Sequence, residues 1–182
     1  MYMARLFFAI ALPEPIQQET ILYMHELKKE FAALNLRWTK PVNLHITVRF
    51  LGETPTEKIM PLTMSLAEKL KNHQTFQIEL TSIQPFPWHY SHLLIRAATL
   101  SKELASVFYT IDETCRNQGF APEIHPFIPH ITLARSQNQL KIDSHQLPKI
   151  GTSSFRVKNI ILFESKNTAS GTIYHPLKEF NL

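Results

Sequence analysis

The sequence predicts an α+β fold in which mostly antiparallel sheets are backed by helices. Short apolar or alternating segments, typical of strands, occur between segments whose apolar residues recur every three or four positions, as on one face of a helix. Nearly the same tetrapeptide also occurs twice, as His45-Ile46-Thr47-Val48 and His130-Ile131-Thr132-Leu133. A repeat of this kind, set in two strand-like segments, indicates an internal duplication.

The first part of the chain predicts a strand, a helix and a second strand. A dense apolar run over residues 5–12 ends at Pro13, and it suits a buried strand better than a helix of that length. After Pro13 the apolar residues keep helical spacing as far as Leu34, so we expect a helix there. Residues 43–51 alternate between apolar and polar side chains, which predicts a strand with one face toward the core.

The rest of the chain continues this mixture. A helix is expected over residues 56–71, with Pro61 delaying its start or kinking it. The other expected elements are strands over 76–83 and 93–98, a helix over 104–119, a strand over 130–134, an apolar segment over 155–164 and a last segment over 172–177. The sequence contains no long polar linker, so we expect one domain over residues 1–182.

Composition narrows the classes of protein that need consideration. A chain of 182 residues with 44% hydrophobic and 19% charged residues has the composition of a soluble globular protein. Its net charge of +4 favours an anionic partner, because clustered Lys and Arg neutralise phosphates. The single cysteine, Cys115, excludes an internal disulfide, and no secretory signal is evident, so we expect a cytoplasmic protein. We also expect a monomer. No apolar run of about 18 residues is present that could span a bilayer.

The two tetrapeptides carry the chemistry. In a strand, residues i and i+2 project from the same face, so each His and its Thr point the same way while the aliphatic residues face the core. Two such strands facing each other would offer a neutral imidazole that accepts a proton, a charged imidazole that donates one, and two hydroxyls that hold phosphoryl oxygens. These groups suffice to open a cyclic phosphodiester. Which histidine is the acid and which is the base stays open at this point.

A single His-x-Thr in a strand is usually a surface pair or a satisfied core pair. Two copies with the same apolar flanks and the same strand context are much harder to explain by chance. The pair therefore carries far more information than either copy, and His45, Thr47, His130 and Thr132 are the candidate site residues.

Further motifs accompany the two tetrapeptides. They are Arg5-Leu6-Phe7-Phe8-Ala9-Ile10, Trp38, Phe50-Leu51-Gly52, Phe127-Ile128-Pro129, Ala134-Arg135, and Leu162-Phe163-Glu164-Ser165 followed by Gly171 and Tyr174. With these motifs the chain resembles, over nearly its whole length, the bacterial and archaeal RNA 2′,3′-cyclic phosphodiesterases of the 2H phosphoesterase superfamily, once called 2′-5′ RNA ligases. One departure lies before the second motif, where members often carry an arginine and this chain has His125-Pro126.

The resemblance implies a bilobal fold with pseudo-twofold symmetry, in which each lobe supplies one His-x-Thr to a central cleft. It implies hydrolysis of RNA or nucleoside 2′,3′-cyclic phosphates to 2′-phosphomonoesters without a metal or other cofactor, and a reverse 2′-5′ ligation. Carried onto this chain, His45 matches the proton donor and His130 the proton acceptor. Arg135 resembles a phosphate-contacting arginine, but strict alternation from His130 would turn it away, so either a bulge or the end of the strand near Ala134 is required. A solvated surface role for Arg135 is the alternative.

Other side chains leave two readings open. Arg49 shares the polar face with His45, so it lies either in the cleft or on its rim. The aromatic residues Phe7, Phe8, Trp38 and Trp88 either stack on a base or, as is more common, pack in the core.

Two other functions compete with hydrolysis. One is a non-catalytic RNA-binding module that uses the same basic cleft. The other is a nucleotide-activating ligase, which the lack of a P-loop sequence disfavours. The seven remaining histidines lack the spacings of a metal cage.

Overall fold

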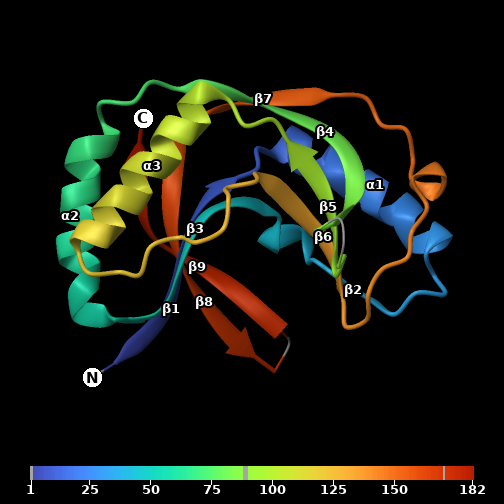
Figure 1. The fold of residues 1–182 in the computed structure, drawn as a ribbon, viewed down its shortest axis with the longest axis horizontal. Helices are drawn as coiled ribbons and strands as arrows, with labels where there is room; N and C mark the ends of the chain where they lie inside the picture. The colour runs from blue at the N-terminus through green and yellow to red at the C-terminus, as the bar shows by residue number, and fades with distance from the viewer. Residues whose placement is uncertain (1, 88–89, 170) are drawn as a thin grey trace.

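A computed structural model of the chain describes residues 2–87, 90–169 and 171–182. It confirms the α+β class (Figure 1). The elements in chain order are β1 Met3–Ala11, α1 Glu14–Glu30, β2 Leu36–Trp38, β3 His45–Pro55, α2 Ile59–Leu70, β4 Phe76–Phe86, β5 Leu93–Ala98, α3 Lys102–Asn117, β6 His130–Ser136, β7 Ser153–Val157, β8 Asn159–Thr168 and β9 Gly171–Asn181. Short 3₁₀ turns occupy Pro41–Asn43, Thr56–Lys58 and Ser144–Gln146.

The strands form one antiparallel sheet in the order β7-β4-β5-β6-β3-β1-β8-β9, with β2 paired to the free side of part of β6. We call β3, β1, β8 and β9 the His45 half, and β6, β5, β4, β7 and β2 the His130 half. The two halves are joined where Ile46 of β3 pairs with Ile131 of β6. The two sheets expected from the sequence thus form one continuous sheet, because the two His-x-Thr strands lie side by side at its centre.

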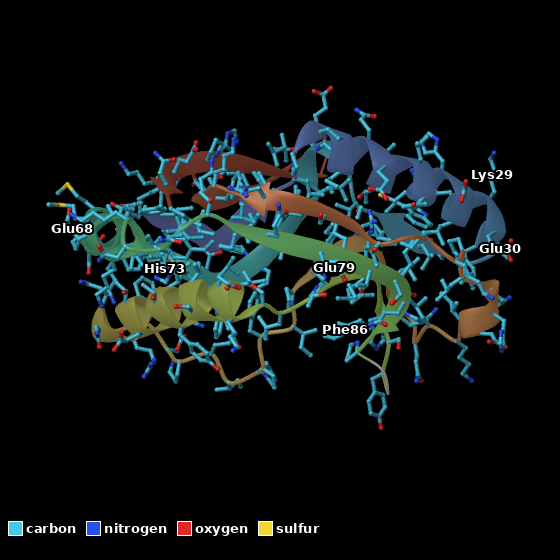
Figure 2. The ribbon with its side chains drawn as sticks, turned by 90° about the horizontal axis from the view of Figure 1, so that it is seen from above. Lys29, Glu30, Glu68, His73, Glu79 and Phe86 are labelled. Carbon is cyan, nitrogen blue, oxygen red and sulfur yellow. The ribbon has the colours of Figure 1, made fainter. Side chains whose placement is uncertain are left out.

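Helices α1 and α3 each contact a strand of the half to which the strand preceding the helix does not belong. Helix α1 follows β1 of the His45 half but packs on β7 of the His130 half, whereas α3 lies between β5 and β6 yet packs on β3. Helices α2 and α3 lie side by side at one end of the molecule, and α1 lies at the other (Figure 1). From above, Lys29 and Glu30 mark the α1 end, while Glu68 and His73 mark the α2 end (Figure 2).

The helix boundaries follow local signals with two adjustments. Helix α1 begins directly after Pro13, but it ends at Glu30, so the expected extension to Leu34 is wrong. The chain turns there to enter β2, and Leu34 is exposed. As Pro61 led us to expect, α2 starts late, behind a 3₁₀ turn, and it buries Leu62, Leu66 and Leu70.

The strand boundaries depend more on tertiary pairing. The apolar segment expected over 155–164 is two strands, because β7 pairs with β4 in the His130 half while β8 pairs with β1 in the His45 half. Strand β2 was not expected, and it forms through its pairing with β6. Among the described residues, no helix is long and apolar enough to cross a membrane.

Candidate active site

The centre of the sheet brings the two His-x-Thr motifs together. Because Ile46 pairs with Ile131 in antiparallel register, His45 lies opposite Thr132 and Thr47 lies opposite His130. Both isoleucines are fully buried, which fixes the other four side chains on the opposite face of the sheet. The residues that the sequence singled out therefore gather at one place, as the duplicated motif predicted.

Each imidazole is oriented by a backbone carbonyl two residues before it. The Nδ1 of His45 lies 2.7 Å from the carbonyl oxygen of Asn43, and the Nδ1 of His130 lies 2.8 Å from that of Ile128. A carbonyl only accepts, so each Nδ1 carries a proton and each Nε2 is left for the site. In His45 this Nε2 lies 2.9 Å from the Thr47 hydroxyl oxygen.

Burial makes both histidines less basic. It lowers the pKa of His45 to about 4, an effect that the Asn43 carbonyl opposes and the positive charges of Arg135 and His130 reinforce. The pKa of His130 is also lowered by burial, with the Ile128 carbonyl opposing and Arg135 adding to the shift. Both imidazoles are therefore predominantly neutral at pH 7 in the empty site.

A bulge brings Arg135 to the same side as His45. Along β6, Ala134 pairs with Leu94 and Thr132 pairs with Ile95, so Leu133 is the extra residue. The irregularity that a cleft-facing Arg135 required is thus present. Strand β3 carries a matching shift, because Arg49 pairs with Phe8 and Thr47 with Ala9, which leaves Val48 as the extra residue.

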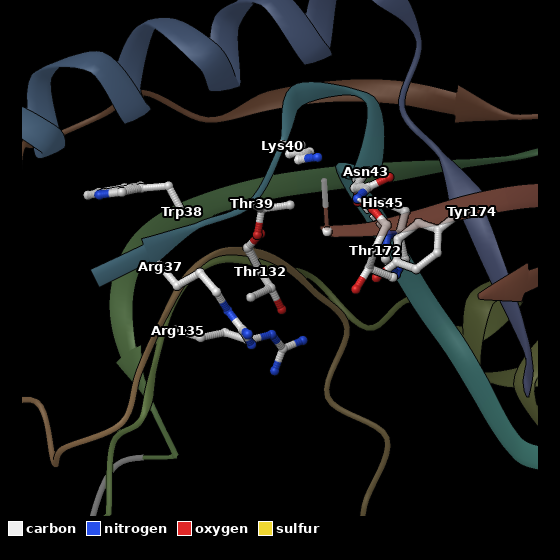
Figure 3. Close-up of a pocket in the computed structure, with 11 residues that line it drawn as sticks. Arg37, Trp38, Thr39, Lys40, Asn43, His45, Thr132, Arg135, Thr172 and Tyr174 are labelled. Atoms are coloured by element: carbon white, nitrogen blue, oxygen red, sulfur yellow. Dashed lines mark hydrogen bonds between the residues drawn. The ribbon is translucent and has the colours of Figure 1, made fainter. Parts of the chain in front are cut away.

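Two pockets flank the paired motifs, and their linings differ in chemistry. The polar pocket, of about 340 Å³, is lined by Arg37, Trp38, Thr39, Lys40, Asn43, His45, Thr132, Arg135, Gly171, Thr172 and Tyr174 (Figure 3). The apolar pocket, of about 510 Å³, contains Thr47 and His130 together with Phe50, Phe86, Pro87, Phe108, Pro126, Phe127 and Ile128. Each pocket therefore holds one histidine and the threonine of the other motif.

Arg49 does not lie on the rim of the cleft. It is buried, its Nε lies 3.0 Å from Asp112 Oδ1 of α3, and its Nη1 lies 3.4 Å from Glu123 Oε2. It also donates a hydrogen bond to the carbonyl of Ala121. Although Arg49 forms part of the wall of the apolar pocket, its charge is held by two carboxylates, because the bulge at Val48 turns it toward α3.

The aromatic residues divide between core and pocket. Phe7 and Phe8 are buried, and the Phe7 ring supports His45 from a centroid distance of 5.1 Å. Trp38 lines the polar pocket, with the Lys28 ammonium 5.7 Å from its ring centroid. Trp88 lies outside the described residues.

Several parts of the site could not be read from the sequence. The carbonyls of Asn43 and Ile128 are backbone groups that any residue would supply, so no sequence signal marks them. Tyr174, whose ring is 5.2 Å from that of His45, was noted only as part of the family-like ending. Arg37 was not singled out, because β2 was not expected. In the described ranges, no group of three or more His, Cys, Asp or Glu side chains is placed to hold a metal ion.

Solved structures share this fold. The crystal structure of Escherichia coli LigT complexed with 3′-AMP matches with a TM-score of 0.85 at 28% identity, covering 100% of this chain and 99% of that one. The PDE domain of MHV ns2 matches with a TM-score of 0.65 at 12% identity, which shows the fold alone.

Sequence comparison then gives the family. A model of LigT-like phosphoesterases matches residues 10–92 and 95–174, so the chain belongs to that family and the resemblance seen in the sequence is confirmed. The RNA 2′,3′-cyclic phosphodiesterase of Methanocaldococcus jannaschii is 32% identical over 184 residues, covering 97% of this chain and 99% of the relative. The protein of the same name from Escherichia coli is 29% identical over 180 residues, covering 98% and 96%.

Proposed function

We propose that the protein hydrolyses RNA or nucleoside 2′,3′-cyclic phosphates to 2′-phosphomonoesters. The observation that carries the proposal is the Ile46–Ile131 pairing, which sets two imidazoles on one face of the sheet with both Nδ1 atoms tied to carbonyls. Family membership and the names of the relatives support the same activity.

In the proposed reaction, the Nε2 of His130 takes a proton from a water molecule as the water oxygen attacks phosphorus. The bond between phosphorus and the 3′ oxygen breaks, and the Nε2 of His45 gives its proton to that oxygen. The 2′-phosphomonoester remains. The choice of His45 as donor and His130 as acceptor rests on the family resemblance, because the geometry of the two motifs is nearly symmetric.

The other site residues have complementary roles in this proposal. The Thr47 and Thr132 hydroxyls donate hydrogen bonds to the non-bridging oxygens, where negative charge builds up. The Arg135 guanidinium holds the phosphate with its planar fork of donors. The ring faces of Phe50, Phe86 and Phe127 in the apolar pocket suit a nucleobase.

The mechanism is proposed to need no metal. The described His, Cys, Asp and Glu side chains provide no cluster of three, and imidazoles tied to carbonyls at Nδ1 serve acid–base chemistry at Nε2. We therefore expect full activity after exhaustive dialysis against EDTA, without added divalent ions or ATP. Loss of activity that zinc or manganese restores would recast His45 and His130 as ligands.

The deciding experiment compares the two histidines. H45A and H130A should each lower kcat on 2′,3′-cyclic AMP by about 10² to 10⁴, the usual scale for a positioned acid or base. In a substrate whose 3′ bridging oxygen is replaced by sulfur, the leaving group is a thiolate, which needs no proton from an acid. H45A should therefore recover most of its rate on that substrate, whereas H130A should not.

The control is H25A, which removes an exposed histidine of α1 that lines neither pocket. Its rates should match those of the wild type on both substrates. Recovery by H130A instead of H45A would reverse the two roles. Binding of cyclic nucleotide without turnover by the wild type would favour the RNA-binding module.

Reverse 2′-5′ ligation follows from the reversibility of the same step. The cytoplasmic location and the monomeric state stay predictions.

A further inference from the structure

Two arginines face each other at the outer side of the polar pocket. Arg37 of β2 pairs directly with Arg135 of β6 in antiparallel register. Directly opposed residues project from the same face, with Cβ atoms about 5 Å apart. Figure 3 shows the two guanidinium groups side by side, pointing into the pocket that contains His45 and Thr132.

This juxtaposition is electrostatically unfavourable in the empty protein. Like charges directly opposite each other destabilise a sheet, and a nearby carboxylate would reduce their repulsion by Coulombic attraction. In the part of the chain that the structure describes, no Asp or Glu forms an ion pair with Arg37 or Arg135, and no Asp or Glu lines the polar pocket. An anionic ligand would supply the missing negative charge.

The arginine pair also stands between two hollows. Both arginines line the polar pocket, and both line a further pocket of about 340 Å³ that includes Asn35, Ser136 and Gln137. The positive charge of Arg135 acts on both catalytic-site histidines, because it lowers the pKa of His45 and the pKa of His130. Arg37 lies on the far side of Arg135, on a different strand. A ligand that reaches Arg37 from the reaction centre therefore extends beyond one phosphate.

We propose that Arg37 binds the phosphodiester on the 5′ side of the terminal ribose in an RNA that ends in a 2′,3′-cyclic phosphate, while Arg135, which has five N–H donors, contacts both that phosphodiester and the cyclic phosphate. The inference rests on the proposed function and deepens it, because it makes an oligonucleotide, rather than a cyclic mononucleotide, the preferred substrate. A phosphodiester has one charge and two non-bridging oxygens, which match the forks of two guanidinium groups. A cyclic mononucleotide has no such group, so it leaves Arg37 without a ligand.

The test compares kcat/KM for 2′,3′-cyclic AMP with kcat/KM for the dinucleotide ApA ending in a 2′,3′-cyclic phosphate. In R37Q the ratio of dinucleotide to mononucleotide should fall about ten-fold, the scale of one charge-assisted hydrogen bond. The matched control is R156Q, which removes an exposed arginine from β7 outside both pockets and should leave the ratio at the wild-type value.

A second arm changes the substrate instead of the protein. Replacing the internucleotide phosphate by an uncharged methylphosphonate should lower the wild-type ratio about ten-fold, and it should have little further effect in R37Q. An unchanged ratio in R37Q, or an equal loss on both natural substrates, would overturn the second phosphate site.

If the wild type turns over neither substrate, the proposed function is rejected but the second phosphate site is not. That site is then tested by a binding measurement. The probe is fluorescein-labelled ApA with a 2′-phosphate, read by fluorescence anisotropy. R37Q should weaken its binding about ten-fold and should not weaken binding of the methylphosphonate form. Equal affinities of wild type and R37Q for the charged probe would reject the site.

Discussion

At the scale of single residues, the site holds its histidines in a state that the proposed reaction must change. Burial lowers the pKa of His45 to about 4, yet a proton donor must carry its proton when the leaving oxygen departs. An anionic phosphate beside the imidazole raises that pKa again, because an opposite charge favours the protonated form. Substrate binding and protonation of His45 are therefore coupled.

This coupling has a consequence for the stability of the empty protein. The pKa of His45 is about 4 in the folded chain and about 6.5 in the unfolded chain, so between these values the unfolded chain binds more protons. Stability should therefore fall as the pH falls through this window. Between pH 7 and pH 4.5 the wild type should lose about 2 kcal/mol more free energy of unfolding than H45Q, as measured by urea denaturation.

The comparison with H45Q isolates His45, because every other titrating group is present in both proteins. Saturating 2′-AMP should shrink the difference, since a bound phosphate raises the pKa of His45 in the folded state. Parallel stability curves for the two proteins across this pH range would contradict the lowered pKa.

At the scale of elements, β3 and β6 show how far alternation alone predicts a site. It placed His45 and Thr47 together and put Ile46 in the core, and the structure agrees. It also placed Arg49 toward the cleft, and Arg49 does line the apolar pocket, but the bulge at Val48 and the carboxylate of Asp112 on α3 direct its guanidinium to α3. Nothing in a single strand reveals a partner on another element.

The same limit explains why other parts of the fold were missed. Strand β2 has three residues, too few for a pattern, and it exists because β6 offers it a free edge. The division at Lys158 is hidden because both flanking segments are apolar and each finds its own neighbour in the sheet. The sequence predicts which side chains of one strand or helix are buried, because burial produces a local pattern. It does not predict which distant strands pair.

The register of β3 and β6 also leads to a prediction about the hydroxyls. T47V and T132V keep the shape of each side chain and remove its donor, so each should cost up to about 3 kcal/mol of transition-state binding. This loss should be measured as kcat/KM on 2′,3′-cyclic AMP, with thermal stability little changed. A rise confined to KM, with kcat unchanged, would mean that the hydroxyls bind the substrate and the transition state equally and do not favour the transition state.

At the scale of the whole molecule, ion pairs made by two buried arginines link α1 and α3 to the sheet. Arg96 of β5 is fully buried, and its Nη2 lies 3.0 Å from Glu19 Oε1 of α1 and 2.8 Å from Ser153 Oγ of β7. Arg49 of β3 makes the corresponding contact with Asp112 of α3. Through these pairs, α1, which follows β1 of the His45 half, is tied to the His130 half, and α3, which lies between β5 and β6 of the His130 half, is tied to the His45 half.

This exchange predicts that the two halves unfold together, and E19Q tests it. The substitution leaves the buried Arg96 charge without its carboxylate and should lower the free energy of unfolding by about 3 kcal/mol. Adding R96M should recover part of that loss, because the unpaired charge is then gone. Urea unfolding followed by tryptophan fluorescence and by far-UV circular dichroism should give one coincident transition in every variant. The control E30Q, at an exposed position of α1, should match the wild type. Two separate transitions, with only the part around α1 lost first in E19Q, would show that the halves fold independently.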